Sequence, residues 1–218
     1  RLTAEGRPSR GPVAGARRCN RGIQGGHGAG ALGFRPRGYS RPEDSSLTEA
    51  WPAMIAAVTD LAGAITGAHR TWLAPDGLGK APVDTPRRAM GNLLGNAVRF
   101  GAANDVLAAG EGIETMLSLR CALPAMPMAA ALSANHLAAL LLPLTLRRLY
   151  ITRDADAAGD MALAALIERA EAAGIEALAL SPRMSDFNED LRAFGIGALG
   201  AALRVQLATQ DGCFFTDD

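Results

Sequence analysis

Cysteine, aromatic residues and lysine are scarce in this chain. Only three of its 218 residues are cysteine, and no two of them form a Cys-x-x-Cys pair, which excludes a cysteine-based zinc ribbon within this sequence. Scattered free thiols indicate a reducing compartment. Aromatic side chains make up 5% of the residues and hydrophobic ones 49%, so Ala, Leu, Val and Ile must fill the core. This composition excludes a disordered chain, a collagen-like chain and a disulfide scaffold.

The sequence also lacks an uninterrupted apolar run that could span a membrane. The most apolar stretch, residues 123–146, is long enough to cross a bilayer but contains three prolines, which a lipid-facing helix tolerates poorly. A buried strand, turn and helix explain it better. The amino-terminal residues contain no apolar segment of the kind found in secretory signals. We therefore expect no membrane association and a cytoplasmic location.

Acidic residues are rare at the start of the chain, although the net charge is zero. Residues 1–42 carry nine arginines and one acid, Glu5. Two interpretations stay open: a basic arm that meets a polyanion, or a solvated, unfolded tail. Residues 1–45 are rich in Gly, Arg and Pro without an apolar period, which predicts a flexible tail.

Residues 46–104 predict a small α+β segment. Two apolar runs, residues 54–59 and 64–73, read as the strands of a hairpin because Asp60 to Gly63 supplies a turn between them. Residues 78–104 read as a mostly polar connector, which contains the only lysine, Lys80.

Strand and helix patterns alternate after residue 104. This alternation predicts an α/β fold with a Rossmann-type, four-stranded parallel sheet flanked by helices, over residues 105–196. A carboxy-terminal helix or tail is expected over residues 197–218. The predicted strands are residues 106–109, 128–132, 149–152 and 175–180, and the predicted helices are residues 115–123, 136–142 and 158–173.

Acidic residues follow three of these strands. Glu111 comes after the first, Asp154 and Asp156 after the third, and Asp186 lies in an acidic loop after the fourth. The carboxyl ends of parallel strands meet at one edge of a sheet. Carboxylates gathered there stay ionised together only with cations between them, and hard oxygen ligands select Mg²⁺, with Mn²⁺ as an alternative. A second interpretation is that the Asp-x-Asp pair only caps the helix that follows.

The sequence around these acids resembles the Toprim domain of bacterial DnaG-type primases, type IA and II topoisomerases and some nucleases. Residues 106–115 resemble its first motif and residues 149–159 its second, in the form found in primases. Residues 186–188 are similar to the acidic motif that follows in primases. A weaker likeness over residues 69–99 matches the segment before Toprim in plasmid- and phage-type primase-helicases.

This resemblance, which covers roughly residues 50–195, implies roles for the acids. Glu111 would act as general base or acid, and Asp154 and Asp156 would hold magnesium, with Glu111 contributing and Asp186 as an auxiliary ligand. Five basic residues upstream would bind nucleotide phosphates or a template backbone, unless they form a solvated connector. They are Arg70, Lys80, Arg87, Arg88 and Arg99.

The function we expect is primase-like, Mg²⁺-dependent nucleotidyl transfer on single-stranded DNA, in replication of a plasmid, phage or other mobile element. Nucleoside triphosphates would be the substrates, and a replicative helicase would act in cis or in trans. The sequence contains no zinc-binding module, no helicase motif and no glycine-rich phosphate loop, so either it is a fragment or partners supply those parts. The alternatives are a Toprim nuclease that nicks DNA and a degenerate module that only binds nucleic acid or a replication partner.

Overall fold

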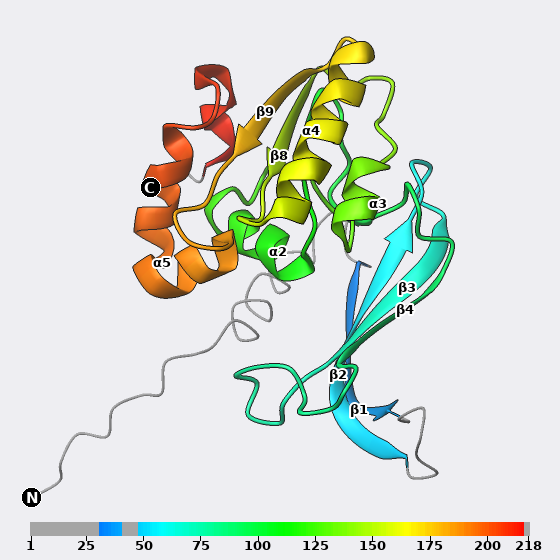
Figure 1. Cartoon of the computed structure of the whole chain (residues 1–218). Helices are drawn as coiled ribbons and strands as arrows, with labels where there is room; N and C mark the ends of the chain where they lie inside the picture. Colours follow the sequence, from blue (N-terminus) through cyan, green and yellow to red (C-terminus); the bar gives the residue numbers. More distant parts are fainter. Residues whose placement is uncertain (1–30, 41–47, 216–218) are drawn as a thin grey trace, which may run out of the picture.

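Two β-sheets organise the protein. The computed structural model describes residues 31–40 and 48–215. An antiparallel sheet has the strand order β1-β2-β3-β4, and a five-stranded sheet has the order β5-β7-β6-β8-β9. Figure 1 shows the antiparallel sheet extending away from the helix-covered one. The sheets are joined where the backbones of Thr59 and Ala97 exchange hydrogen bonds of 2.9 and 3.2 Å.

The antiparallel sheet contains the predicted hairpin and two strands that the sequence did not indicate. Its strands are β1 (Leu32–Ser40), β2 (Glu49–Thr59), β3 (Ile65–Trp72) and β4 (Arg87–Gly91). The prediction of a flexible tail is wrong for residues 32–40, because they pair with β2. The rest of that tail lies outside the described residues, apart from Ala31. Residues 48–104 contain strands and turns but no helix, so the α+β prediction for this segment is wrong for its described part.

The two faces of the antiparallel sheet have different surroundings. Residues directly opposite in an antiparallel pair share a face. On one, Ala56 and Val58 belong to the core cluster that includes Met116 of the neighbouring domain, and we call this the inner face. On the other, Ala53 and Trp72 form a separate small cluster beneath residues 81–83, and we call this the outer face.

The second sheet confirms the predicted parallel architecture. Four strands run parallel: β6 (Val106–Gly110), β7 (Met128–Ala130), β8 (Arg148–Thr152) and β9 (Glu176–Leu180). β5 (Val98–Phe100) adds an antiparallel edge beside β7. This fifth strand lies in the segment predicted to be a connector, and its three residues are too few to show an alternating pattern.

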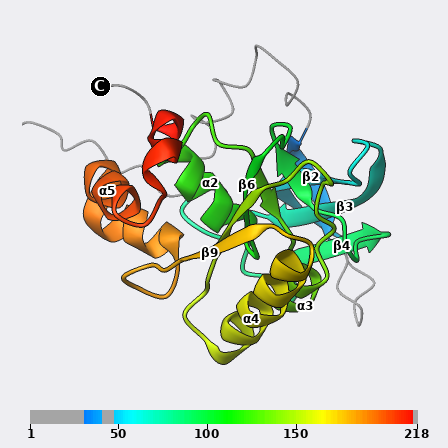
Figure 2. The same cartoon turned by 90° about the horizontal axis from the view of Figure 1, so that it is seen from above.

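Helices cover both faces of the second sheet, as Figure 2 shows. α2 (Ile113–Ala122) and α5 (Phe187–Arg204) lie on one face, and α3 (Ala134–Ala138) and α4 (Ala157–Ala172) on the other. A short helix, η1 (Thr209–Phe214), follows α5. α5 runs through residue 196, so the predicted domain boundary there falls inside a helix.

Two core clusters fill the space on either side of this sheet. Strand side chains alternate between them: Ala108 and Tyr150 point to the side of α2 and α5, and Leu107 and Ile151 point to the side of α3 and α4. All four are at most 1% exposed. Alanine, leucine and methionine dominate both clusters, as the low aromatic content requires. Among the described residues, no helix is long and apolar enough to cross a membrane.

Candidate functional site

The carboxyl edge of the parallel sheet carries the predicted acidic residues on adjacent loops. Glu111 follows β6 directly, and the carbonyl oxygens of Gly110 and Glu111 accept hydrogen bonds of 2.8 Å from Ala131 and Leu132. These bonds tie the Glu111 loop to the end of β7. A Cβ added to Gly110 would overlap the Thr152 hydroxyl on β8, so a glycine here allows the two strands to meet.

Asp154 and Asp186 are held near each other by a link between their loops. The backbone N–H of Ala155 donates to the carbonyl oxygen of Ser185 at 2.9 Å. The loop before α5 is itself braced by Asp190, which is 2% exposed and accepts hydrogen bonds of 2.9 Å from the backbones of Arg183 and Met184. The sequence pattern does not predict this role of Asp190, and its only signal there is its place in an acidic run.

Asp156 and Asp186 also cap helices, as the alternative interpretation held for the Asp-x-Asp pair. Oδ1 of Asp156 accepts from the Gly159 N–H at 2.7 Å, and Oδ1 of Asp186 accepts from the Glu189 N–H at 2.7 Å. A carboxylate has two oxygens and several lone pairs, so a cap and a cation contact are compatible.

Two carboxyl groups at the carboxyl edge of the parallel sheet have raised pKa values, as expected for crowded carboxylates. Burial raises the pKa of Glu111 to about 7, and the negative charges of Asp154 and Asp156 add to this shift, while a hydrogen bond from the Ala134 backbone opposes it. Burial likewise raises the pKa of Asp154 to about 6, with Asp186 and Asp156 contributing repulsion. The four predicted acids therefore act on one another.

Two observations fit a divalent cation at this edge. Oδ1 of Asp154 is buried and has no hydrogen-bond partner, which is costly for a carboxylate oxygen unless a cation or water meets it. The donors are hard oxygens that repel each other. However, no three His, Cys, Asp or Glu side chains of the described residues form a ready ligand set. An ion here would complete its shell with water and substrate oxygens, which is usual for Mg²⁺.

The predicted basic residues do not form one group. Lys80 and Arg87 lie on the inner face, because they pair with Leu73 and Thr71. Arg70 and Arg88 pair with each other on the outer face. Arg99 lies on the edge strand β5, on the side of α3 and α4.

Arg99 has an unusual environment for a cation. Its Nε and Nη2 atoms are buried without hydrogen-bond partners. Burial lowers the pKa of Arg99, and the negative charge of Asp60 opposes that shift.

His69 lies on the inner face with Lys80 and Arg87, and Glu114 of α2 acts on it electrostatically, although the sequence pattern predicts a function for neither His69 nor Glu114. His69 is half-buried on β3, with Nδ1 unpartnered. Burial lowers the pKa of His69, the charge of Glu114 raises it, and the charges of Arg87 and Lys80 lower it further. The inner face therefore lies within electrostatic range of the first turn of α2. The available signal for Glu114 was its position three residues after Glu111.

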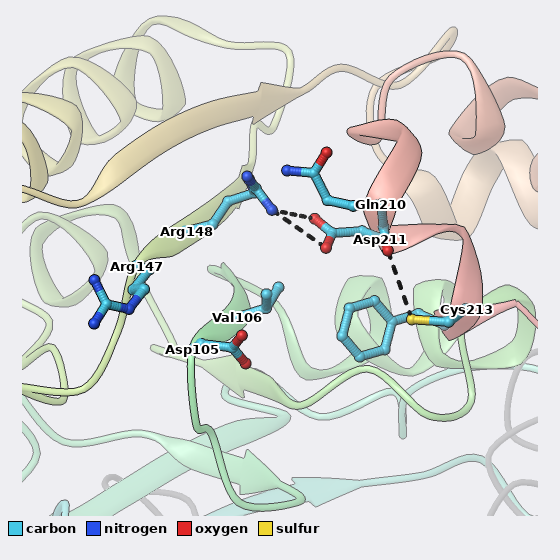
Figure 3. Close-up of a pocket in the computed structure, with 8 residues that line it drawn as sticks. Asp105, Val106, Arg147, Arg148, Gln210, Asp211 and Cys213 are labelled. Carbon is cyan, nitrogen blue, oxygen red and sulfur yellow. Dashed lines mark hydrogen bonds and ion pairs between the residues drawn. The ribbon is translucent and has the colours of Figure 1, made fainter.

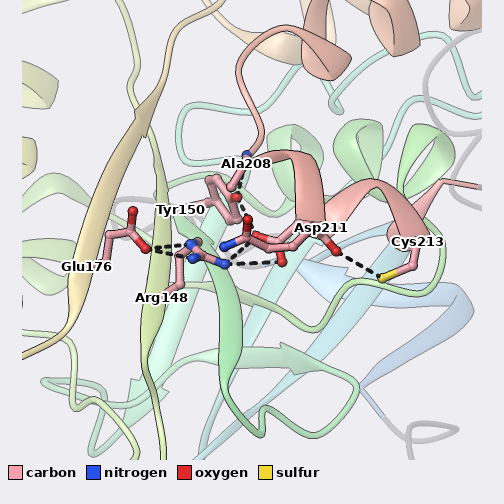
Figure 4. A network of polar contacts seen from close by, with 7 residues as sticks. Arg148, Tyr150, Glu176, Ala208, Asp211 and Cys213 are labelled. Carbon is pink, nitrogen blue, oxygen red and sulfur yellow. Dashed lines mark hydrogen bonds and ion pairs between the residues drawn. The ribbon is translucent and has the colours of Figure 1, made fainter.

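A cavity of about 460 Å³ lies at the opposite edge of the parallel sheet (Figure 3). It is lined by the amino ends of β6 and β8 and by η1, so it is separate from the acidic loops. Figure 4 shows the polar network beside it. Arg148 contacts Glu176 at 2.7 Å and Asp211 at 3.0 Å, and the Tyr150 hydroxyl donates to Asp211 at 2.5 Å. This network fastens η1 to the sheet.

Family models match two segments of the chain. One, described as a Toprim domain, matches residues 106–197. The other, described as a domain of unknown function (DUF7146), matches residues 1–100. No curated protein matches the chain.

Solved structures of primases share the fold. A DNA primase domain from Pseudomonas aeruginosa is 16% identical with a TM-score of 0.52, and the match covers 80% of this chain and 65% of that one. The primase fragment of the bacteriophage T7 primase-helicase is 13% identical with a TM-score of 0.52, covering 72% and 63%. The Aquifex aeolicus primase is 16% identical with a TM-score of 0.51, covering 78% and 44%. This chain thus spans less than two thirds of each.

Proposed function

Since the chain carries a Toprim domain over residues 106–197 with the fold of DnaG-type primase domains, we propose that it is a primase-like enzyme. It would join nucleotides on single-stranded DNA with Mg²⁺, or with Mn²⁺ in its place. The setting we propose is replication of a plasmid, phage or other mobile element, beside a replicative helicase in cis or in trans.

One observation carries this proposal: Glu111 and Asp154 lie on the loops that follow the adjacent parallel strands β6 and β8, and the charge of Asp154 helps to raise the pKa of Glu111. Glu111, Asp154 and Asp156 would hold the cation, with Asp186 as an auxiliary ligand. Oδ1 of Asp154 is buried without a hydrogen-bond partner, so a bound cation would stabilise this oxygen most. Bound Mg²⁺ would neutralise the negative charge of the triphosphate oxygens, including the charge that develops during the transfer.

The reaction would join a primer 3′-hydroxyl to an incoming nucleotide. The 3′-oxygen attacks the α-phosphorus, the bond from that phosphorus to the bridging oxygen of the β-phosphate breaks, and pyrophosphate leaves. A carboxylate oxygen of Glu111 accepts the proton of the 3′-hydroxyl. Gly110 and Gly112 on either side of Glu111 leave the carboxylate uncrowded for this role.

The inner-face cations would orient the triphosphate. Lys80 and Arg87 on the inner face and Glu114 in the first turn of α2 all act electrostatically on His69. Charge-assisted hydrogen bonds to phosphate would hold the leaving group in line with the attacking oxygen. Arg99 lies on a different side of the fold, and we assign it no contact with the nucleotide.

Template-dependent incorporation of labelled nucleotides tests the proposal. The wild-type protein should extend a template-primer with Mg²⁺, and Asp154→Ala should abolish incorporation. Asp160→Ala, which removes a carboxylate of the same segment that pairs with Arg153, should retain it. Equal incorporation by wild type and Asp154→Ala would overturn the assignment. Relaxation of plasmid DNA with Mn²⁺ and no nucleotides would instead identify a nuclease.

A further inference from the structure

A histidine with an unpartnered ring nitrogen lies on the inner face of the antiparallel sheet. His69 on β3 is paired with Ala56 on β2 and with Ala89 on β4. The small side chains at these two positions leave the imidazole without a bulky neighbour on either adjacent strand. Nδ1 of His69 is buried without a hydrogen-bond partner, which is costly for a polar atom unless a ligand or water meets it.

A second polar atom without a partner lies two residues along the same face of β3. Thr71 is 1% exposed, and its Oγ1 is buried with no hydrogen bond. Arg87 lies directly opposite Thr71 on β4 and is exposed. Lys80, paired with Leu73, is exposed on the same face. Two unsatisfied polar atoms therefore border two exposed cations, a combination that suits a negatively charged ligand with several oxygens.

The inner face is connected to the acidic edge of the parallel sheet through α2. It packs in the core cluster that contains Met116, and Sδ of Met116 accepts a hydrogen bond of 3.8 Å from the Thr152 hydroxyl. Thr152 lies two residues before Asp154. Glu114, in the first turn of α2, acts electrostatically on His69. A nucleotide with its α-phosphate at the acidic edge and its β- and γ-phosphates on the inner-face cations would therefore meet His69.

The charges around His69 make its protonation depend on a bound anion. Burial lowers the pKa of His69, and the charge of Glu114 on α2 opposes that shift. Arg87 on β4 and Lys80 lower the pKa further, and β2 places only the uncharged Ala56 opposite the imidazole. A triphosphate beside His69 adds several negative charges, which raise the pKa of a neighbouring histidine. Binding of the nucleotide would thus protonate the imidazole and make it a proton donor.

We propose that His69 protonates the leaving pyrophosphate during nucleotidyl transfer. As the bond between the α-phosphorus and the bridging oxygen breaks, that oxygen keeps the electron pair. The imidazolium of His69 donates its proton to an oxygen of the β-phosphate, so the product leaves as monoprotonated pyrophosphate and the ring becomes neutral. The inference rests on the proposed function, in which Glu111 takes the proton of the 3′-hydroxyl, and adds a second proton transfer on the leaving-group side of the phosphorus.

Titration of the imidazole tests the contact without turnover. The chain has three histidines, so the double variant His27→Gln/His136→Gln leaves His69 as the only source of imidazole signals in a proton NMR spectrum. An α,β-methylene nucleoside triphosphate cannot be cleaved at the α-phosphorus. Its binding with Mg²⁺ should raise the pKa of His69. An unchanged pKa of His69 with the analogue bound, in a protein that incorporates nucleotides, would overturn this proposal alone.

Single-turnover rates with two leaving groups test the proton transfer itself. His69→Gln should lower the rate by about 10²–10⁴-fold. The loss should be larger for a β,γ-methylene triphosphate than for the β,γ-difluoromethylene analogue, because the fluorinated leaving group is less basic and needs the proton less. The ratio of the two rates does not depend on the fraction of folded enzyme.

A second histidine provides the matched control. His136 on α3 is also half-buried with Nδ1 unpartnered, and His136→Gln should keep the wild-type ratio of the two rates. Equal ratios in wild type and His69→Gln would overturn the proposal. Absence of incorporation by the wild-type protein would instead overturn the proposed function, and this proposal with it.

Discussion

Gly159 packs against the backbone of Asp154 so closely that a Cβ on Gly159 would overlap the Asp154 carbonyl oxygen. This contact brings the first turn of α4 against the loop that carries the acidic pair. It explains in physical terms why a glycine stands five residues after Asp154 in this segment.

Substitution of this glycine should disturb the site. We expect Gly159→Ala to lower the free energy of unfolding by about 1–3 kcal/mol, because backbone atoms cannot yield to the added methyl group. Urea denaturation measures the change. Gly200→Ala is a matched control in α5, where nothing lies within 4 Å of the added Cβ, and it should raise stability by about 0.5–1 kcal/mol. An equal gain in the free energy of unfolding for Gly159→Ala would contradict the close contact between Gly159 and the Asp154 backbone.

Magnesium should stabilise the protein by relieving repulsion among the acids. The melting temperature of wild type should rise when Mg²⁺ is added. Asp154→Asn should be more stable than wild type without metal, by about 1 kcal/mol or less because the site is partly open to solvent. The melting temperature of Asp154→Asn should rise little when Mg²⁺ is added. Calorimetric melting with and without the ion checks this, and a full Mg²⁺ response in the variant would contradict it.

Arg148 and Arg147 are adjacent but should differ in their effect on stability. Arg148→Met leaves Asp211, whose side chain is 6% exposed, without its cation, and we expect a loss of about 3–5 kcal/mol. Arg147 is exposed, so Arg147→Met should change stability by less than about 0.5 kcal/mol. Denaturant unfolding of both variants measures this. Similar losses of stability in Arg148→Met and Arg147→Met would show that the polar network in Figure 4 does not hold η1 against the sheet.

The Tyr150 hydroxyl should lose its proton at a higher pH than an ordinary tyrosine. Burial raises the pKa of Tyr150 to about 12, and its hydrogen bond to Asp211 adds to the shift. Because this pKa is higher in the folded than in the unfolded chain, stability falls as pH rises from about 10 to 12.

A background with a single tyrosine makes this measurable. The chain has two tyrosines, so Tyr39→Phe leaves Tyr150 as the only source of phenolate absorbance. Its titration should have a midpoint at about 12, and Asp211→Asn should lower that midpoint without abolishing the shift due to burial. An ordinary tyrosine midpoint in the Tyr39→Phe protein would contradict the buried position.

The parallel sheet could be predicted from the sequence because its strands are short apolar runs between clear helical patterns. Leu107 to Ala109 and Leu149 to Ile151 are continuous hydrophobic stretches, as buried parallel strands require. The positions of the acidic residues at the ends of two of these strands followed from topology alone.

The antiparallel sheet was harder to predict because its strands do not alternate cleanly. β1 contains Pro36 at an irregularity in the register between Arg35 and Gly38, and most of its residues are exposed. β4 is exposed along most of its length and is specified by pairing with β3. The division of the basic residues between two faces depends on that pairing, so no local pattern could reveal it.

The cap at α3 shows how a local signal can mislead. Asn135 is a good capping residue by type, and the sequence predicts a helix from His136. The structure instead uses Ser133, whose hydroxyl accepts from the His136 N–H at 3.3 Å. Both residues are favoured at this position, and the tertiary fold decides between them.

Titration with Mn²⁺ followed by electron paramagnetic resonance tests the central claim most directly, since it detects the ion without requiring turnover. Wild type should bind Mn²⁺, Asp154→Asn should lose most of the affinity, and Asp160→Asn should keep it. Indistinguishable Mn²⁺ binding by wild type and Asp154→Asn would contradict a cation site formed by the acids at the carboxyl edge of the sheet.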